Sequence, residues 1–382
     1  MKKILKSIWD YIRRLDIILV LLCFTASGFS ILLLYSLSEN GYISAGDYKT
    51  QILALALGAF CMFFLAGVDY KHLSKFWPIY TVPALALVML LFTGLGRGVA
   101  GADDIGWLQI AGVSVQPSEF LKIAFIMTFS RHLYKDGKNI NKPTHFLLFC
   151  AHGLFPVALV SIQGDDGTAL VFLSMFIVMM VIAGLSWKYI LAGCVAIPTA
   201  CFVAWNYLMQ PHHKARFLVI FDTQMQQEEI NGIFHQQYWG RIALGSGGLK
   251  GVGLFGGEYV YVPEIQNDYI FSYIGNALGF VGCLLTIILL TFIIMKIFAN
   301  SLTAKDKLGK YICVGVFAMV LFHMAINIGM VLVVMPVIGI PLPFISAGGT
   351  STLSLYIAIG LVLSVTSHRE KKYHLFYKEK DE

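Results

Sequence analysis

The sequence predicts an all-α, polytopic membrane protein with about ten transmembrane helices and one large extracytoplasmic loop. Hydrophobic residues make up 57% of the 382 residues and charged residues only 13%, which is far from the composition of a soluble protein. Apolar runs close to the ~20 residues that cross a hydrocarbon core of ~30 Å recur from end to end. Only one connection between them is long, at residues 209–267.

Each of the ten apolar runs is expected to form one membrane span. The first run follows a basic stretch, as the core of a signal peptide would. It is too long for that role and lacks a clean small-residue cleavage site, so we expect it to be retained as a span. In chain order, the runs are 16–37, 48–68, 77–95, 116–134, 145–163, 166–185, 187–208, 268–298, 308–337 and 351–367.

The basic residues predict the orientation, because Lys and Arg collect in cytoplasmic loops. With ten spans and the amino terminus inside, 21 of the 28 Lys and Arg residues lie on one side, six lie on the other, and Lys122 lies within a span. Both termini of this single membrane domain are therefore expected in the cytoplasm, with a basic amphipathic segment at 1–15 and a tail at 368–382. The net charge of +6 favours anionic lipid headgroups rather than nucleic acid.

The segment 209–267 is expected to face outward as a shaped loop. Connections longer than ~15 residues are usually functional or disordered, and the aromatic residues of this segment argue against disorder. Arg241 and Lys250 accompany its glycine-rich stretch, "LGSGGLKGVGLFGG" at 244–257. Two interpretations remain open: a turn-rich loop, or a contact to a diphosphate. Glycine-rich backbone can bind anions, but the GxxxxGK[ST] pattern is absent.

Two charged residues lie inside the fourth run. Glu119 and Lys122 are three residues apart, which places them on one helical face where they can pair. Ions within a membrane are costly and commonly functional, and the alternative is a structural ion pair that ties helices together. Asp165, just before the sixth run, either orients Lys122, coordinates a divalent ion or caps a helix. All seven cysteines lie in apolar runs without a CxxC pair, so neither a disulfide framework nor a zinc site is expected.

Asp268 lies at the mouth of the eighth run, in the stretch "VPEIQNDYIF" at 262–271. One interpretation is a helix cap, because carboxylates satisfy the free amide groups at the start of a helix. The other is a catalytic base at the membrane surface. The residues by themselves favour the cap.

Five segments carry a resemblance to a known family. They are "QPSEFLK" (116–122), "QGDDGTA" (163–169), "ALGSGGLKGVG" (243–253), "VPEIQNDYIF" (262–271) and "GIPLPFISAGGTS" (339–351). Their order and spacing resemble those of the SEDS family, the bacterial shape, elongation, division and sporulation proteins that include RodA, FtsW and SpoVE. The likeness extends over nearly the whole chain and is slightly closer to RodA than to FtsW.

The resemblance implies a peptidoglycan glycosyltransferase of the bacterial plasma membrane. Such proteins polymerise lipid II, an undecaprenyl-diphosphate-linked disaccharide peptide, at the outer face of that membrane. They serve cell elongation, shape or division and work with a class B penicillin-binding protein. Asp268 matches the family's essential aspartate, and Asp165 matches the aspartate of Q-P-D-L-G-T-A. Glu119 and Lys122 match the charged positions of Q-P-S-E-x-x-K. A divalent cation, Mg or Mn, is left open as a cofactor.

The expected chemistry needs a base near the acceptor hydroxyl and positive charge near the departing diphosphate. Asp268 is the candidate base and Lys122 the leading candidate for the diphosphate, with Arg241 and Lys250 as further contacts. Two other functions compete with this one: a non-catalytic scaffold for the penicillin-binding protein, and a transporter of the lipid-linked precursor. Few ionisable residues lie deep in the cytoplasmic half of the spans, which argues against transport.

Departures from the family pattern leave room for a divergent paralogue with altered substrate contacts or partners. They fall at Gly106, Gln266, Asn267, Asn276 and Ala347, where many members have Arg, His, Thr, Glu and Tyr, respectively.

Overall fold

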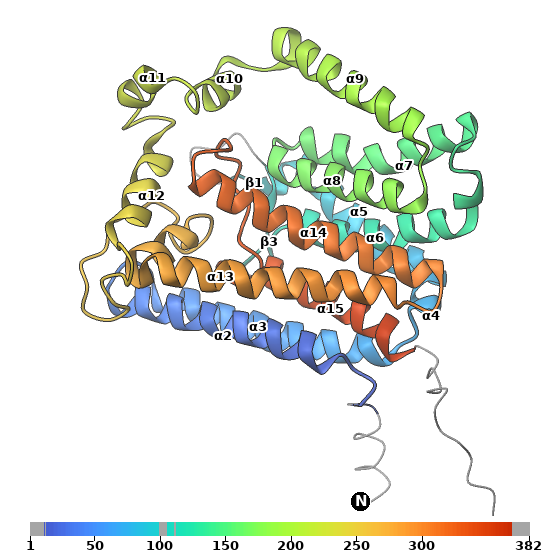
Figure 1. Cartoon of the computed structure of the whole chain (residues 1–382), viewed down its shortest axis with the longest axis horizontal. Helices are drawn as coiled ribbons and strands as arrows, with labels where there is room; N and C mark the ends of the chain where they lie inside the picture. The colour runs from blue at the N-terminus through green and yellow to red at the C-terminus, as the bar shows by residue number, and fades with distance from the viewer. Residues whose placement is uncertain (1–10, 12, 99–104, 111, 369–382) are drawn as a thin grey trace, which may run out of the picture.

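The long helices of the chain pack side by side in one bundle (Figure 1). The computed structural model describes residues 11, 13–98, 105–110 and 112–368. The expected amphipathic segment at 1–15 therefore lies mostly outside the described residues, and of the expected tail at 368–382 only residue 368 is described.

The helices fall in two groups along the chain. Before the long connection lie α2 (Ile17–Glu39), α3 (Ala45–Gly67), α4 (Tyr70–Lys75), α5 (Trp77–Leu90), α6 (Pro117–Asp136), α7 (Pro143–Ser161), α8 (Asp166–Ala183) and α9 (Trp187–Val203). Short π-helical turns, η1 (Leu91–Leu95) and η3 (Ala204–Leu208), extend α5 and α9, and a 3-10 turn, η2 (Gly137–Asn139), follows α6. Then come α10 (Pro211–Leu218), α11 (Thr223–Glu228), α12 (His235–Ser246), α13 (Ile270–Leu302), α14 (Lys307–Val331) and α15 (Gly349–Ser367).

All ten predicted runs coincide with helices, which confirms the all-α membrane fold. Among the described residues, nine helices are long and apolar enough to cross a membrane. The remaining predicted run is α6, which has 20 residues but carries five charged residues within its length: Glu119, Lys122, Arg131, Lys135 and Asp136. Glu119 and Lys122 are buried against neighbouring helices, whereas Arg131 and Lys135 lie near the carboxyl-terminal end of α6.

One predicted boundary was wrong by six residues. The ninth run was expected to reach residue 337, but α14 ends at Val331. The backbone N–H groups of Val334 and Met335 both donate to the carbonyl of Gly329, at 2.8 and 3.1 Å. Val333 adopts a positive φ of 59° in this turn. Hydropathy alone does not register such a turn, because its residues are as apolar as the helix before it.

Polar residues at the helix starts explain several of the observed boundaries. Asp16 accepts a hydrogen bond from the N–H of Leu19 at the start of α2, and Asp306 accepts one from Gly309 at the start of α14. Ser44 and Asp47 form a capping box at the start of α3. Each cap satisfies N–H groups that have no partner within the helix itself.

A small antiparallel sheet between α5 and α6 was not predicted. Its strands are β1 (Gly96–Arg97), β2 (Trp107–Ile110) and β3 (Val113–Val115), in that order across the sheet. Leu108 pairs with Val115, and Gly112, with a φ of 83°, lies in the turn between β2 and β3. The strands are too short for alternation of apolar and polar residues to reveal them.

Small residues allow close helix contacts in the bundle centre. A Cβ on Gly58 of α3 would lie 2.9 Å from Tyr356 of α15, and one on Gly360 of α15 would lie 2.9 Å from the backbone of Met62. Such close approach is how membrane helices gain packing energy. By contrast, no residue is buried in the membrane-length window of α9, and this helix diverges from the bundle (Figure 1).

Candidate active site

Asp268 lies in the loop immediately before α13, and its carboxylate is not a helix cap. The residue at the cap position is Tyr269, and α13 has no side-chain cap hydrogen bond. Within the described part of the chain, the Asp268 carboxylate makes neither a hydrogen bond nor an ion pair. The capping alternative therefore does not describe this geometry.

The backbone around Asp268 is held by a second loop, residues 338–348. Asn327 of α14 is fully buried, and its amide group donates to the carbonyls of Asp268 and Ile340, at 2.8 and 2.7 Å. The Ser346 hydroxyl donates to the carbonyl of Asn267 at 2.5 Å. These contacts fix the position of the carboxylate without using the carboxylate itself.

The surroundings of Asp268 disfavour its ionised form. Burial, followed by the negative charges of Glu264 and Asp165, raises the pKa of the Asp268 carboxyl to about 7. The backbone of Gly339, with a φ of 62°, passes so close that a Cβ there would lie 3.6 Å from Oδ2 of Asp268. Glu264 also has a positive φ of 56°. Such backbone strain in a non-glycine residue is concentrated at functional sites.

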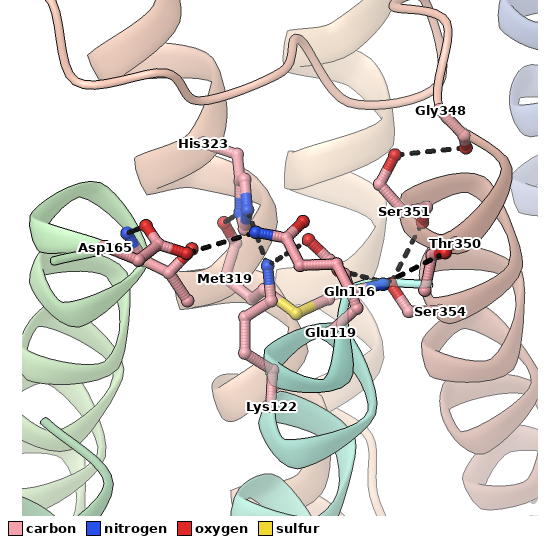
Figure 2. A network of polar contacts seen from close by, with 11 residues as sticks. Gln116, Glu119, Lys122, Asp165, Met319, His323, Gly348, Thr350, Ser351 and Ser354 are labelled. Atoms are coloured by element: carbon pink, nitrogen blue, oxygen red, sulfur yellow. Dashed lines mark hydrogen bonds and ion pairs between the residues drawn. The ribbon is translucent and has the colours of Figure 1, made fainter. Parts of the chain in front are cut away.

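Glu119 and Lys122 form the ion pair that their spacing predicted, inside a larger buried network (Figure 2). Lys122 Nζ donates to Glu119 Oε1 at 2.8 Å and lies 2.9 Å from His323 Nε2. Ser354 donates to the other Glu119 oxygen at 2.6 Å. Lys122 is 1% exposed and Glu119 3% exposed. The pair therefore ties α6 to α14 and α15, as the structural alternative expected.

The geometry assigns the His323 tautomer. His323 Nδ1 lies 2.8 Å from the carbonyl of Met319, which can only accept, so Nδ1 carries the proton. Nε2 then offers its lone pair to the Lys122 ammonium. His323 was not among the predicted site residues. Its signal in the sequence was its spacing to Asn327, since two polar residues four apart in an apolar run share a face that must point into protein.

Asp165 caps α8 and also connects it to the start of α6. Its Oδ1 accepts from the N–H of Thr168 at 2.9 Å, and its Oδ2 accepts from the Gln116 side chain at 3.1 Å (Figure 2). The N–H of Gln116 in turn lies 3.4 Å from the Thr350 hydroxyl in the first turn of α15. The amino-terminal ends of α6, α8 and α15 thus meet here. Helix amino termini carry partial positive charge and favour anions.

The loop that holds Asp268 borders this meeting of helix ends. Residues 338–340 pass over the first turn of α8 so closely that a Cβ on Gly167 would clash with the carbonyl of Ile338. The same 338–340 backbone also passes close to Asp268, and the negative charge of Asp165 contributes to the raised pKa of the Asp268 carboxyl.

The glycine-rich stretch at 244–257 is held against α13 by backbone hydrogen bonds. The N–H groups of Val252 and Gly253 donate to the carbonyls of Asn276 and Ala277, at 3.0 and 2.9 Å. They do so where α13 is interrupted by Gly279, which has a φ of 67°. The turn-rich interpretation describes this stretch, since two of the amide groups that an anion would need are already used.

Arg241 and Lys250 are exposed and separate from the ion-pair network. Arg241 lies over the ring of Phe234, with 5.9 Å between the guanidinium carbon and the ring centre. Within the described residues, neither Arg241 nor Lys250 makes a hydrogen bond or ion pair with Asp268, Glu119 or Lys122. The structure therefore does not bring these two basic residues into contact with the rest of the predicted site.

No three His, Cys, Asp or Glu side chains gather at a metal-binding distance among the described residues.

Comparisons with known proteins agree with one another. The family described as "Cell cycle protein", which groups FtsW, RodA and SpoVE, matches residues 13–371. Peptidoglycan glycosyltransferase MrdB of Escherichia coli K12 is 27% identical over 369 residues, covering 96% of each chain. A probable peptidoglycan glycosyltransferase FtsW of Bacillus subtilis is 31% identical over 390 residues, covering 96% of this chain and 92% of the relative. A chain from a solved peptidoglycan synthase complex shares the fold, with a TM-score of 0.79 and 23% identity, covering 93% of this chain and 99% of that one.

Proposed function

The chain belongs to the FtsW, RodA and SpoVE family and is a peptidoglycan glycosyltransferase, and from this premise we propose that Asp268 is the general base that takes the proton from the acceptor hydroxyl when lipid II is polymerised. The observation that carries this proposal is the partly buried Asp268 carboxylate, which has no hydrogen-bond or ion-pair partner among the described residues. A buried carboxylate with a purely structural role is expected to accept hydrogen bonds from a donor group of the protein. One kept to remove a proton needs a pKa near the working pH and an open lone pair.

The step balances as a simple glycosyl transfer. The acceptor sugar hydroxyl gives its proton to the Asp268 carboxylate while its oxygen forms the new bond to the anomeric carbon of the donor. The bond between that carbon and the donor's diphosphate oxygen breaks. The lipid diphosphate leaves with the electron pair, and the protonated Asp268 then returns its proton to water.

Positive potential for the leaving diphosphate comes, in this proposal, from helix ends and from Lys122. The amino termini of α6, α8 and α15 meet near Asp268 through Asp165 and Gln116. Lys122 is held by Glu119 and His323, so it acts on the diphosphate through its field rather than by direct contact. Arg241 and Lys250, which are exposed, attract the anionic substrate toward the site.

The proposed setting is the outer face of the bacterial plasma membrane, with both termini in the cytoplasm. The excess of Lys and Arg on the side of the termini supports this orientation. A class B penicillin-binding protein is the proposed partner, and the shared fold with a chain of a peptidoglycan synthase complex supports it.

The test is glycan polymer formation by purified protein with its penicillin-binding protein partner and lipid II, while the partner's transpeptidase is blocked. Asp268→Asn keeps the shape of the side chain but removes the base, so the rate should fall about 10²–10⁴-fold. Partner binding should be unchanged. Near-normal polymer yield at matched expression would instead favour the non-catalytic scaffold.

A further inference from the structure

A second cavity lies toward the opposite end of α6 from the Asp268 site. Its volume is about 400 Å³, and it is lined by residues of α5, α6 and α7. From α5 come Trp77, Thr81 and Leu85, which are four residues apart and therefore share one face. Along α6 the lining extends from Leu121 to Lys135, which corresponds to about 20 Å at ~1.5 Å per residue.

The two ends of this cavity differ in character. Near Leu121 the walls are apolar, with Leu85 and Phe125 among the lining residues. At the other end, Arg131 and Lys135 line it from the last turns of α6. Such an arrangement matches a ligand that has an apolar chain and an anionic head.

Arg131 and Lys135 place two positive charges at the basic end of the cavity. Arg131 reaches only the Ser74 hydroxyl, at 3.4 Å, and neither Arg131 nor Lys135 forms an ion pair in the described part of the chain. The one nearby carboxylate among the described α6 residues at this end, that of Asp136, lies 4.0 Å from Nε2 of His132, whose Nδ1 lies 3.1 Å from Nδ1 of His152. The hydroxyl oxygen of Thr81 is buried and lacks a hydrogen-bond partner among the described residues.

The cavity opens toward the surroundings of the bundle. Trp77 at its basic end is 42% exposed and Phe155 of α7 is 52% exposed. Trp residues concentrate at the level of lipid headgroups, which places the basic end of the cavity at that level. The volume lies within the ~300–1,000 Å³ of pockets for small ligands and is too small to admit a helix of a partner protein.

We propose that this cavity binds one anionic phospholipid from the leaflet on the basic side of the protein. The headgroup phosphate pairs with Arg131 and Lys135, and an acyl chain lies along Phe125 and Leu85 toward Leu121. Basic pockets between membrane helices on the cytoplasmic side are known to select such headgroups. This inference is independent of the catalytic proposal, because the site lies away from Asp268 and uses different side chains.

Native mass spectrometry of the purified full-length protein tests the proposal, with dioleoyl phosphatidylglycerol, dioleoyl phosphatidylcholine and inorganic phosphate as separate additions. The wild-type protein should retain one phosphatidylglycerol in preference to phosphatidylcholine, and inorganic phosphate should not displace it. The double variant Arg131→Gln/Lys135→Gln should bind phosphatidylglycerol roughly 30-fold more weakly, since each charge near the surface contributes about fivefold.

The matched control is Lys138→Gln/Lys142→Gln, which removes two exposed charges at the same end of the bundle without touching the cavity. It should leave phosphatidylglycerol binding within about twofold of wild type. Leu85→Trp fills the apolar part without changing charge and should also displace the lipid. Equal binding of the two phospholipids, equal weakening by both double variants, or unchanged binding in a folded Leu85→Trp protein would each overturn the proposal.

Discussion

The ammonium of Lys122 on α6 lies 2.9 Å from Nε2 of His323 on α14, although 201 positions separate the two residues in the chain. One turn further along α14, on the same face, lies Asn327, whose amide group donates to the backbone carbonyl of Asp268. One face of α14 therefore supports both the buried ion pair and the loop of the proposed base.

Replacing Lys122 alone should destabilise the protein, because Glu119 would remain as an unpaired buried charge. Lys122→Met is expected to lower the free energy of unfolding by about 3–5 kcal/mol. The double variant Glu119→Gln/Lys122→Met removes both charges and should recover most of the thermal stability in detergent. If polymerisation stays low in the double variant, Lys122 also supplies catalytic charge. Full recovery of both stability and activity would restrict the pair to a structural role.

The polymerisation rate should rise with pH and level off above about 8. A base with a pKa of about 7 is ionised above that pH, and its active fraction falls about tenfold per pH unit below it. Glu264→Gln removes a like charge that raises this pKa, so the inflection should move to lower pH and activity at pH 6 should increase. An unchanged inflection in Glu264→Gln would argue that Asp268 does not control the profile.

Asp268→Asn should be more thermally stable than wild type at high pH only. The raised pKa means that the folded protein binds the proton more tightly than the unfolded chain, so stability falls as pH rises from about 4 to about 7. Above pH 7, the ionised and buried Asp268 carboxylate lowers the free energy of unfolding by up to about 4 kcal/mol. The melting temperature of Asp268→Asn should therefore exceed that of wild type at pH 8 and match it near pH 4. An equal difference in melting temperature at both pH values would contradict a buried carboxyl group with a raised pKa.

Asn327→Leu should slow polymerisation beyond its effect on folding. The substitution leaves the carbonyls of Asp268 and Ile340 without the Asn327 donor. Each unsatisfied carbonyl should lower the free energy of unfolding by about 1–3 kcal/mol. Gln237→Leu is the matched control, since the buried Gln237 amide also donates to two backbone carbonyls, those of Met330 and Met335. Comparable losses of melting temperature are expected, but only Asn327→Leu should reduce the rate per folded molecule. Equal rates in the two variants would show that the Asp268 loop is not held by Asn327 in a way that matters for catalysis.

Much of the fold could be predicted because a bilayer imposes a length on each apolar run. Where this rule failed, the deciding contacts were backbone hydrogen bonds in turns and short strands, which hydropathy does not show. The turn after Val331 is as apolar as the helix it ends, and the strands at Trp107–Ile110 and Val113–Val115 are too short to show a period. For the site, local spacing was sufficient to pair Glu119 with Lys122. It could not show that His323 and Ser354 complete the network, because those contacts cross more than 200 residues.

The sequence by itself determined the membrane class, the family and the residues worth testing, since hydropathy and ordered motifs are properties of the chain alone. Only the tertiary structure decided what each of those residues does locally. In it, Asp165 caps α8, the glycine-rich stretch bonds to α13, Lys122 forms half of a buried ion pair, and the Asp268 carboxylate has no hydrogen-bond donor among the described residues. The physical reason is that the local role of a polar group in a low-dielectric interior depends on its hydrogen-bond and ion-pair partners, and these partners lie on helices distant in the sequence.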